Sequence, residues 1–218
     1  IKEKFDLCLA SSKASEEHLK QLNAKNLMYI GNIKLSDTIN SENIVNENEK
    51  ILLQKKFWCA ASTHNGEEIF CLKTHLKIKK IYKDIITIII PRHIDRSKSI
   101  KKLSEQYKLT TQILNDGDYI QDNKEIIIVN SFGVLPKFFK YSKSVFIGKS
   151  ILKKFKQIGG QNPLQAAKLG CKIYHGPFVY NFEEIYTFLK SYKITNKIND
   201  EIELSNNLTK DLKDNQKK

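Results

Sequence analysis

Residues 85–96 of this chain read Ile85-Ile86-Thr87-Ile88-Ile89-Ile90-Pro91-Arg92-His93-Ile94-Asp95-Arg96. The first half of this stretch is an almost unbroken apolar run, which is typical of a strand that is buried on both faces of a sheet. A predicted helix, from about Asp95 to Tyr107, follows the strand. A buried strand that leads into a helix is the building unit of a parallel sheet covered by helices.

The same alternation of apolar runs and predicted helices continues on both sides of this stretch. The other predicted strands are residues 5–10, 27–30, 57–61, 126–129, 144–147 and 172–175, and the other predicted helices are residues 14–22, 67–80, 135–140, 163–169 and 182–192. A polar segment, residues 38–48, predicts a linker or an exposed helix. We therefore expect an α/β fold with a Rossmann-like, doubly wound parallel sheet, in which ligands bind at the carboxyl ends of the strands.

The composition limits the class of protein. A hydrophobic content of 40% over 218 residues is sufficient for a core. The formal net charge of +13 favours an acidic partner (a nucleic acid, an anionic membrane or a phosphorylated substrate), although compositional drift explains it equally well. Four scattered cysteines predict buried thiols in a reducing compartment. Since the sequence shows neither a membrane span nor a signal-peptide pattern, we expect a soluble or peripheral protein.

The two arginines of the chain are Arg92 and Arg96, among 37 basic residues in total. The abundance of Lys, Ile and Asn suggests an AT-biased coding sequence, which favours lysine wherever any positive charge is adequate. A guanidinium differs from an ammonium because its planar donors bind a carboxylate or phosphate bidentately. The pair therefore predicts an anion site at the carboxyl end of a strand. The alternative is a solvated helix start.

A second loop follows the strand at residues 57–61. Residues 60–68 contain small side chains and two hydroxyls, including that of Ser62, and we expect this loop to hold an anion. Asn65 and Glu68 have the spacing of a capping box. The alternative is that Asn65 only caps the helix and that His64 is an ordinary loop histidine.

Two more loops have the composition of ligand-binding turns. Gly159 and Gly160 precede a helix for which Asn162 is the predicted N-cap and Pro163 the first residue, an arrangement that predicts a phosphate site. The alternative is a glycine turn without a ligand. In residues 130–136, Gly133 permits close approach of the backbone to a ligand.

Several other functions lack their motifs. The histidines and cysteines show no metal-ligand spacing, so we expect no metal and no cofactor. No GxSxG or Walker motif supports a serine hydrolase or a P-loop NTPase. Nucleic-acid binding remains only as an alternative, because lysines lie along every predicted helix and the aromatic residues do not alternate with them.

Four motifs, taken in order and with their spacing, resemble the 3-deoxy-D-manno-octulosonic acid (Kdo) transferases of lipopolysaccharide synthesis. They are Trp58-Cys59-Ala60-Ala61-Ser62-Thr63-His64-Asn65-Gly66-Glu67-Glu68, Pro91-Arg92-His93-Ile94-Asp95-Arg96, Gly159-Gly160-Gln161-Asn162-Pro163-Leu164 and Gly176-Pro177-Phe178-Val179-Tyr180-Asn181-Phe182. The resemblance implies the GT-B architecture of two Rossmann-like domains. It also implies transfer of Kdo from the donor CMP-Kdo to the lipid A precursor, without a metal in the donor site, by a peripheral enzyme at the cytoplasmic face of the bacterial inner membrane. The basic surface would then face anionic lipid.

The resemblance also implies a division of the chain and a set of donor contacts. Residues 1–33 correspond to the last strand and helix of the acceptor domain with the crossover, residues 34–194 to the donor-binding domain, and residues 195–218 to a polar C-terminal helix or tail. The implied CMP contacts are Pro91, Arg92, Phe132, Gly133, Val134, Asn162, Pro163, Leu164 and Gln165, and the loop residues Ser62, Gly159 and Gly160 complete the predicted site.

The chain departs from the family pattern at several of these positions. Asn130, Val134 and Gln165 are neutral where the family usually has acidic residues, and Gln161 replaces a histidine. A neutral group binds a ribose hydroxyl less strongly than a carboxylate does. The family's general base is a glutamate of the first domain, outside the matched region, so we assign no catalytic residue and expect this chain alone to be inactive. The alternatives are a degenerate, non-catalytic remnant or binding module, and a basic nucleic-acid-binding domain.

Overall fold

The structure, a computed structural model, describes residues 5–32, 36 and 38–213. The chain divides into two compact units, Ile1–Thr38 and Ile39–Lys218.

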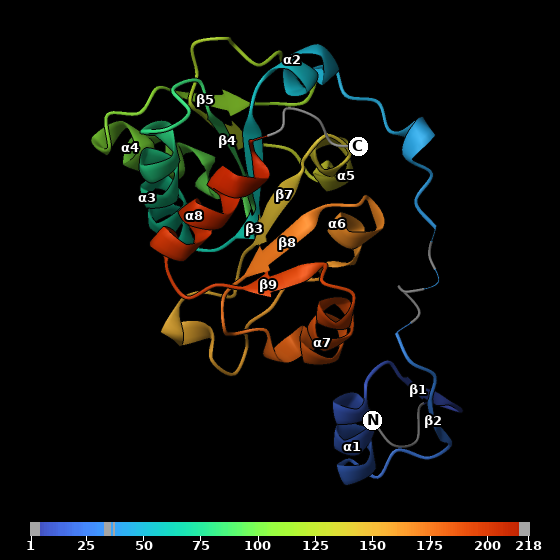
Figure 1. Cartoon of the computed structure of the whole chain (residues 1–218). Coiled ribbons are helices and arrows are strands. Elements are labelled where there is room, and N and C mark those ends of the chain that lie inside the picture. Colours follow the sequence, from blue (N-terminus) through green and yellow to red (C-terminus); the bar gives the residue numbers. More distant parts are fainter. Residues whose placement is uncertain (1–4, 33–35, 37, 214–218) are drawn as a thin grey trace. The chain divides into compact units, whose positions relative to one another are not determined.

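The first unit is a single β-α-β element (Figure 1). Strands β1 (Cys8–Ala10) and β2 (Leu27–Tyr29) pair in parallel, and helix α1 (Lys13–Gln21) connects them. The Ser12 hydroxyl caps α1 by accepting the N–H of Ser15. Because two strands and one helix enclose little space, large apolar side chains such as Leu9 and Met28 remain exposed.

The second unit contains a seven-stranded sheet in the order β5-β6-β4-β3-β7-β8-β9 (Figure 1). Every strand pair in it is parallel, which confirms the predicted sheet. The strands are β3 (Phe57–Thr63), β4 (Ile86–Pro91), β5 (Thr111–Leu114), β6 (Ile126–Val129), β7 (Ser144–Ile147), β8 (Lys172–His175) and β9 (Thr195–Lys197).

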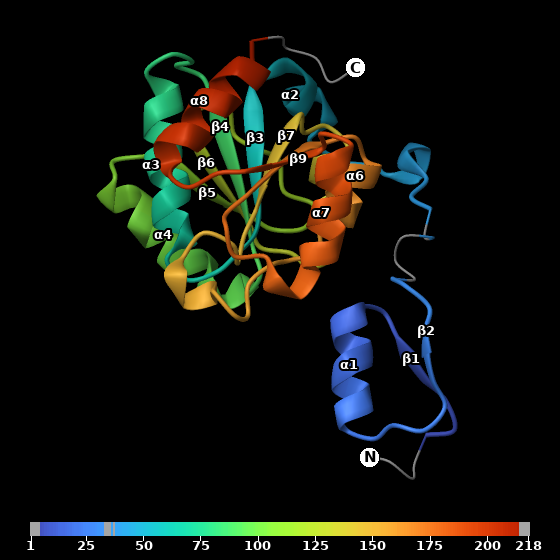
Figure 2. The ribbon, with the colours of Figure 1, turned by 60° about the horizontal axis from the view of Figure 1, so that its bottom comes forward.

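Helices cover both faces of this sheet (Figure 2). Helices α3 (Glu67–Lys79), α4 (Ser97–Gln106) and α8 (Glu201–Asp211) share one core cluster, and helices α2 (Glu49–Gln54), α5 (Leu135–Phe139), α6 (Leu164–Lys168) and α7 (Glu183–Ser191) share the other. Among the described residues, the short 3-10 helices are η2 (Ser41–Asn43), η3 (Ile94–Arg96), η4 (Lys153–Phe155) and η5 (Tyr180–Phe182).

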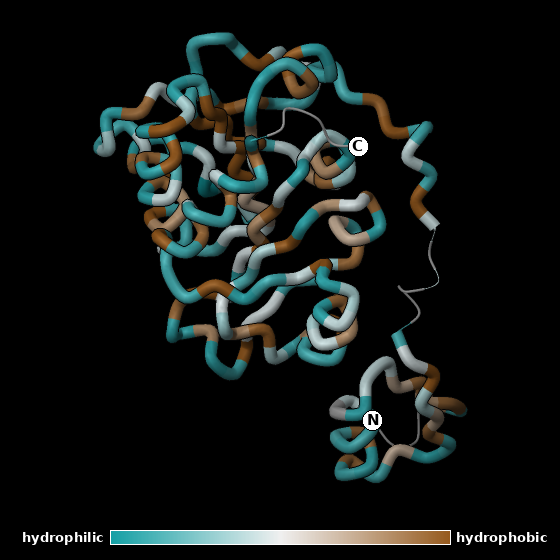
Figure 3. Tube along the Cα trace, viewed as in Figure 1, coloured by the Kyte–Doolittle hydropathy of each residue, from teal (hydrophilic) through white to brown (hydrophobic). Residues whose placement is uncertain are grey.

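The side chains of β3 point alternately into the two core clusters, one on each face of the sheet. Cys59 and Ala61 point into the α5–α6 side, whereas Trp58 and Ala60 point into the α3–α8 side, and all four are fully buried. The hydropathy of the trace agrees with this arrangement, since hydrophobic positions concentrate on the central strands and hydrophilic stretches form many outer turns (Figure 3). No helix among the described residues has the length and apolar character needed to span a membrane.

The C-terminal segment belongs to the second unit. We expected a polar helix or tail over residues 195–218; within the described part of this segment, residues 195–213, the chain forms β9 and then α8, which packs against α3. Leu204, Leu208 and Leu212 recur every four residues and are buried, so α8 presents one apolar face to the core. At its end, the Asp211 carboxylate accepts hydrogen bonds from the hydroxyls of Ser144 and Tyr174.

Candidate functional site

The strand order creates a switch point beside β3. The chain runs from β3 to β4 and β6 on one side and then returns to β7 on the other side of β3. In parallel sheets of this kind, the crevice at the carboxyl ends of the strands where the order reverses is the usual ligand site. The residues that follow β3 (62–66) and β7 (148–151) border it here.

Glu67 joins the two loops at this switch point. Its carboxylate is fully buried and accepts hydrogen bonds from the main-chain N–H groups of His64 (2.9 Å), Lys149 (2.6 Å), Ser150 (2.9 Å) and Ile151 (3.3 Å). Burial raises the pKa of Glu67, and these donors oppose that effect. The main-chain N–H of His64 is therefore already hydrogen-bonded to a carboxylate of the protein itself, although we expected this loop to hold an external anion.

Ser62 and His64 shape the end of β3. Ser62 is the extra residue of a β-bulge and has a left-handed backbone with φ of 55°, a feature common next to active sites. The His64 ring nitrogen Nδ1 lies 3.1 Å from the Ser62 carbonyl oxygen. Burial lowers the pKa of His64, and the positive charges of Lys149 and Arg96 lower it further. The positive charges of Lys149 and Arg96 therefore act at the end of β3.

The predicted capping box at Asn65 and Glu68 is wrong. Gly66, with φ of 97°, is the N-cap residue of α3, and no side chain caps the helix there. Glu68 instead receives both terminal nitrogens of Arg96, at 2.8 and 2.9 Å, and is only 1% exposed. A bidentate, charge-assisted pair is stronger than a neutral cap, which explains this orientation.

The two arginines consequently have different environments. Arg96 forms the internal pair, so the bidentate role expected of an arginine is present but is directed at a carboxylate of the protein itself. Arg92 follows the buried Pro91, and its exposed guanidinium contacts no partner among the residues the structure describes. Its main-chain N–H donates to the Thr63 carbonyl at 3.0 Å, so Arg92 lies beside the end of β3.

The loop after β6 is held by amide contacts. The Asn130 side chain accepts the Ser97 hydroxyl (3.0 Å) and donates to the Asn115 side chain (2.9 Å), which fixes this loop beside the start of α4. Phe132 is 71% exposed, and Gly133 has φ of 74°. Val134 is buried at the N-cap of α5.

The loop before α6 begins its helix one residue later than predicted. The Asn162 side chain accepts the N–H of Leu164 at 3.0 Å, and Pro163 occupies the N-cap position. Leu164 is buried in the core, whereas Gln165 is exposed.

The glycine pair in that loop permits close packing of backbones. A Cβ on Gly159 would lie 2.3 Å from the Phe178 carbonyl oxygen, so only glycine fits. The N–H of Gly160 donates to the Lys149 carbonyl at 2.7 Å, and is therefore already used inside the protein. These contacts bring the loop after β7, the glycine loop and the segment after β8 together.

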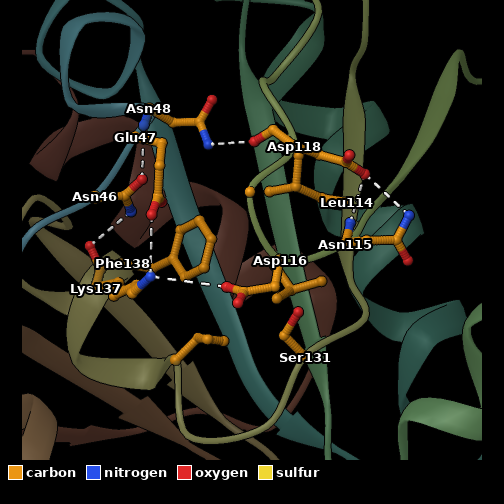
Figure 4. Close-up of a pocket in the computed structure, with 13 residues that line it drawn as sticks. Asn46, Glu47, Asn48, Leu114, Asn115, Asp116, Asp118, Ser131, Lys137 and Phe138 are labelled. Atoms are coloured by element: carbon orange, nitrogen blue, oxygen red, sulfur yellow. Dashed lines mark hydrogen bonds and ion pairs between the residues drawn. The ribbon is translucent and has the colours of Figure 1, made fainter.

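A pocket adjoins the loop after β6 (Figure 4). It is lined by Asn46, Glu47, Asn48, Leu114, Asn115, Asp116, Gly117, Asp118, Val129, Ser131, Val134, Lys137 and Phe138. Lys137 lies between the carboxylates of Glu47 (3.3 Å) and Asp116 (3.8 Å), and Asn48 donates to the Asp118 carbonyl. This pocket could not be predicted from the sequence, because its walls come from segments that lie far apart in the chain and are joined by contacts such as Asn46–Lys137 and Asn48–Asp118.

Metal ligation finds no support in the part of the chain that the structure describes, where no group of three or more His, Cys, Asp or Glu residues could hold an ion.

No protein-family model matches the chain. It is 28% identical over 211 residues to the 3-deoxy-D-manno-octulosonic acid transferase of Aquifex aeolicus, covering 96% of this chain and 54% of that protein. It is 30% identical over 162 residues to the transferase of the same name from Haemophilus influenzae, covering 73% of this chain and 37% of that protein. The chain is a relative of the Kdo transferases. It spans about half the length, or less, of the Kdo transferases that it matches.

A solved structure agrees in fold. The crystal structure of the C-terminal CMP-Kdo binding domain of WaaA from Acinetobacter baumannii matches with a TM-score of 0.67 and 22% identity, covering 75% of this chain and 83% of that domain. The second unit therefore shares the Rossmann-like fold of that domain, as the resemblance implied.

Proposed function

We propose that this chain is the donor-binding portion of a Kdo transferase and binds CMP-Kdo at the carboxyl ends of β3, β4, β6 and β7. The observation that carries the proposal is the position of Arg92. Its guanidinium is exposed and has no partner among the described residues, beside a switch point of a fold that a CMP-Kdo binding domain shares. A guanidinium in that position suits the phosphate of a nucleotide.

The other predicted contacts would place the base of the nucleotide at the loop after β6 and its ribose at the start of α6. The exposed ring of Phe132 would cover one face of the cytosine, and Gly133 would let the backbone approach it. Gln165, exposed on α6, would reach a ribose hydroxyl through a neutral hydrogen bond. Leu164 and Pro163 are buried, so their part would be to hold α6 in place rather than to contact the ligand.

Transfer itself needs more than this site. We propose that the acceptor is the lipid A precursor and that its binding site and the general base belong to the other half of the transferase, either in a longer chain or in a partner. The net charge of +13 supports a peripheral position at the cytoplasmic face of an inner membrane, where basic side chains attract anionic lipid and the acceptor's phosphates.

Titration calorimetry with CMP tests the donor site, and UMP is the control for the base. We expect saturable, CMP-selective binding that weakens at least about tenfold in Arg92→Ala, since a bidentate phosphate contact is lost. Lys98→Ala, which removes an exposed cation from the neighbouring helix α4, should bind like the unaltered chain. A folded protein without CMP affinity would overturn the proposal and favour a non-catalytic remnant.

A further inference from the structure

Lys149 has a left-handed backbone that, unlike those of Lys108 and Lys193, does not follow a helix. It follows β7 with φ of 55°, in the left-handed region that side chains with a Cβ rarely adopt. Its N–H donates to Glu67 and its carbonyl accepts from Gly160, so contacts on both sides impose this conformation. Glycine would adopt it without strain. Strained residues of this kind gather at functional sites, which makes the side chain the place to seek a function.

The ammonium group of Lys149 is not neutralised by the protein. It forms no ion pair or side-chain hydrogen bond with the residues that the structure describes, and its side chain is half-buried. Two carboxylates lie in the neighbouring segment at the start of α3, but Glu67 is occupied by four main-chain N–H groups and Glu68 by Arg96. The positive charge is therefore available to a ligand.

Lys149 and Arg92 flank the end of β3 from its two neighbouring strands, β7 and β4. Neighbouring strands are about 4.8 Å apart, so the two backbones are separated by roughly 10 Å, a gap that both long side chains can bridge. A CMP-linked ulosonic acid carries two anions on adjacent groups, the phosphodiester and the sugar carboxylate. The two positive charges that the protein does not neutralise therefore match the two negative charges of such a donor.

We propose that Lys149 binds the sugar carboxylate of the donor while Arg92 binds its phosphate. This assignment rests on the proposed function and adds the residue that distinguishes an acidic sugar from a neutral one. It also explains the strained conformation, because glycine at this position would fit the backbone better but would carry no charge.

Three variants separate charge from strain, and each is titrated with CMP and with freshly prepared CMP-Kdo. Lys149→Gly should raise the urea midpoint of unfolding, because the strain is relieved, and should weaken CMP-Kdo binding at least tenfold while CMP binding changes less than threefold. Lys149→Met should lose CMP-Kdo affinity equally, and Lys149→Arg should retain most of it. Lys153→Met, at an exposed lysine in the same connection, should behave like the unaltered chain.

The outcomes distinguish the two proposals. If the unaltered chain binds CMP and CMP-Kdo but Lys149→Gly and Lys149→Met bind CMP-Kdo as tightly, the carboxylate assignment is overturned and the donor site stands. Equal losses for CMP and CMP-Kdo would also overturn it, because the lysine would then contact the phosphate. If the unaltered chain binds neither ligand, the donor site itself is overturned, and the lysine assignment with it.

Discussion

Arg96 donates two parallel hydrogen bonds to Glu68, and the carboxylate that receives them is 1% exposed. Replacement by alanine would leave that charge buried without its partner, so we expect Arg96→Ala to lower the free energy of unfolding by about 3 kcal/mol. Arg96→Lys should lose about 1 kcal/mol, because the charge remains while the bidentate geometry is lost. Urea unfolding followed by circular dichroism measures both. Arg92→Ala is the matched control, and equal stability of all four proteins would contradict the pairing.

Glu67→Gln tests the clamp at the switch point. Each carboxylate oxygen accepts two main-chain N–H groups, so an amide in either orientation directs its own NH₂ at two donors. We expect a loss of about 2–3 kcal/mol in the free energy of unfolding. Glu183→Gln, at an exposed position on α7, should cost less than about 0.5 kcal/mol. A difference between the two variants too small to measure would show that Glu67 does not hold the loops together.

Acid should destabilise the second unit through His75. This side chain is fully buried, its Nδ1 lies 2.9 Å from the Thr87 hydroxyl, and burial lowers its pKa from 6.5 to about 4. Since the folded state binds the proton less readily than the unfolded state, stability is present above pH 6.5 and falls as the pH drops toward 4, by up to about 3 kcal/mol.

The measurement is the urea midpoint between pH 7 and pH 4. His75→Gln should show a shallower decline than the unaltered protein, whatever its stability at pH 7. His93→Gln, at an exposed residue, should retain the full decline. An unchanged decline in His75→Gln would assign the acid sensitivity to another group, such as the buried His175, whose pKa burial lowers to about 4.

Two glycines should respond very differently to an added methyl group. A Cβ on Gly176 would lie 2.1 Å from the main-chain oxygen of Ser150, which cannot move without breaking the contact between two loops. We expect Gly176→Ala to cost at least about 3 kcal/mol. Gly133→Ala meets no atom within 4 Å and pays only for its φ of 74°, about 1 kcal/mol. Thermal unfolding measures the stability of both variants. If Gly133→Ala were the less stable of the two, the close approach of the two loop backbones at Gly176 would be contradicted.

Asp211 anchors the last helix to the sheet. Its carboxylate accepts hydrogen bonds from Ser144, Lys172 and Tyr174, at 2.8, 2.8 and 2.5 Å. Asp211→Ala should therefore lower the free energy of unfolding by about 2–3 kcal/mol and speed hydrogen exchange in α8. Lys210→Ala, at the exposed neighbouring residue, is the control. Unchanged exchange in α8 would contradict the anchoring role.

The central sheet could be predicted from sequence, whereas its edges could not. Strands β4 and β6 are covered on both faces, so burial selects unbroken apolar runs that are visible in the sequence. Strands β5 and β9 lie at the two ends of the sheet and have one neighbour each. Their sequences, Thr111–Leu114 and Thr195–Lys197, are polar enough to resemble loops.

The candidate site followed the same rule. The strand-end loops were predictable, because a parallel sheet brings them to one edge. A bidentate arginine was expected to bind a ligand, whereas the structure shows this geometry for Arg96 with Glu68 of the protein itself. The hydrogen-bond partners of these groups could not be predicted. Arg96 pairs with Glu68, and main-chain N–H groups donate to Glu67, because the fold buries these two acidic side chains. The sequence spacing favoured a helix cap by Asn65 together with Glu68. In the structure Gly66 is the N-cap residue, and Glu68 pairs with Arg96 instead.

Trp58 is the single tryptophan of the chain and lies fully buried between the sheet and α3 and α8. Its indole therefore emits from an apolar, water-free environment, and its fluorescence should shift to the red only when the second unit opens. The first unit contributes no such chromophore, although it contributes helix and strand to the far-ultraviolet spectrum. Comparing the two optical signals during melting thus shows whether the two units lose structure together or one after the other.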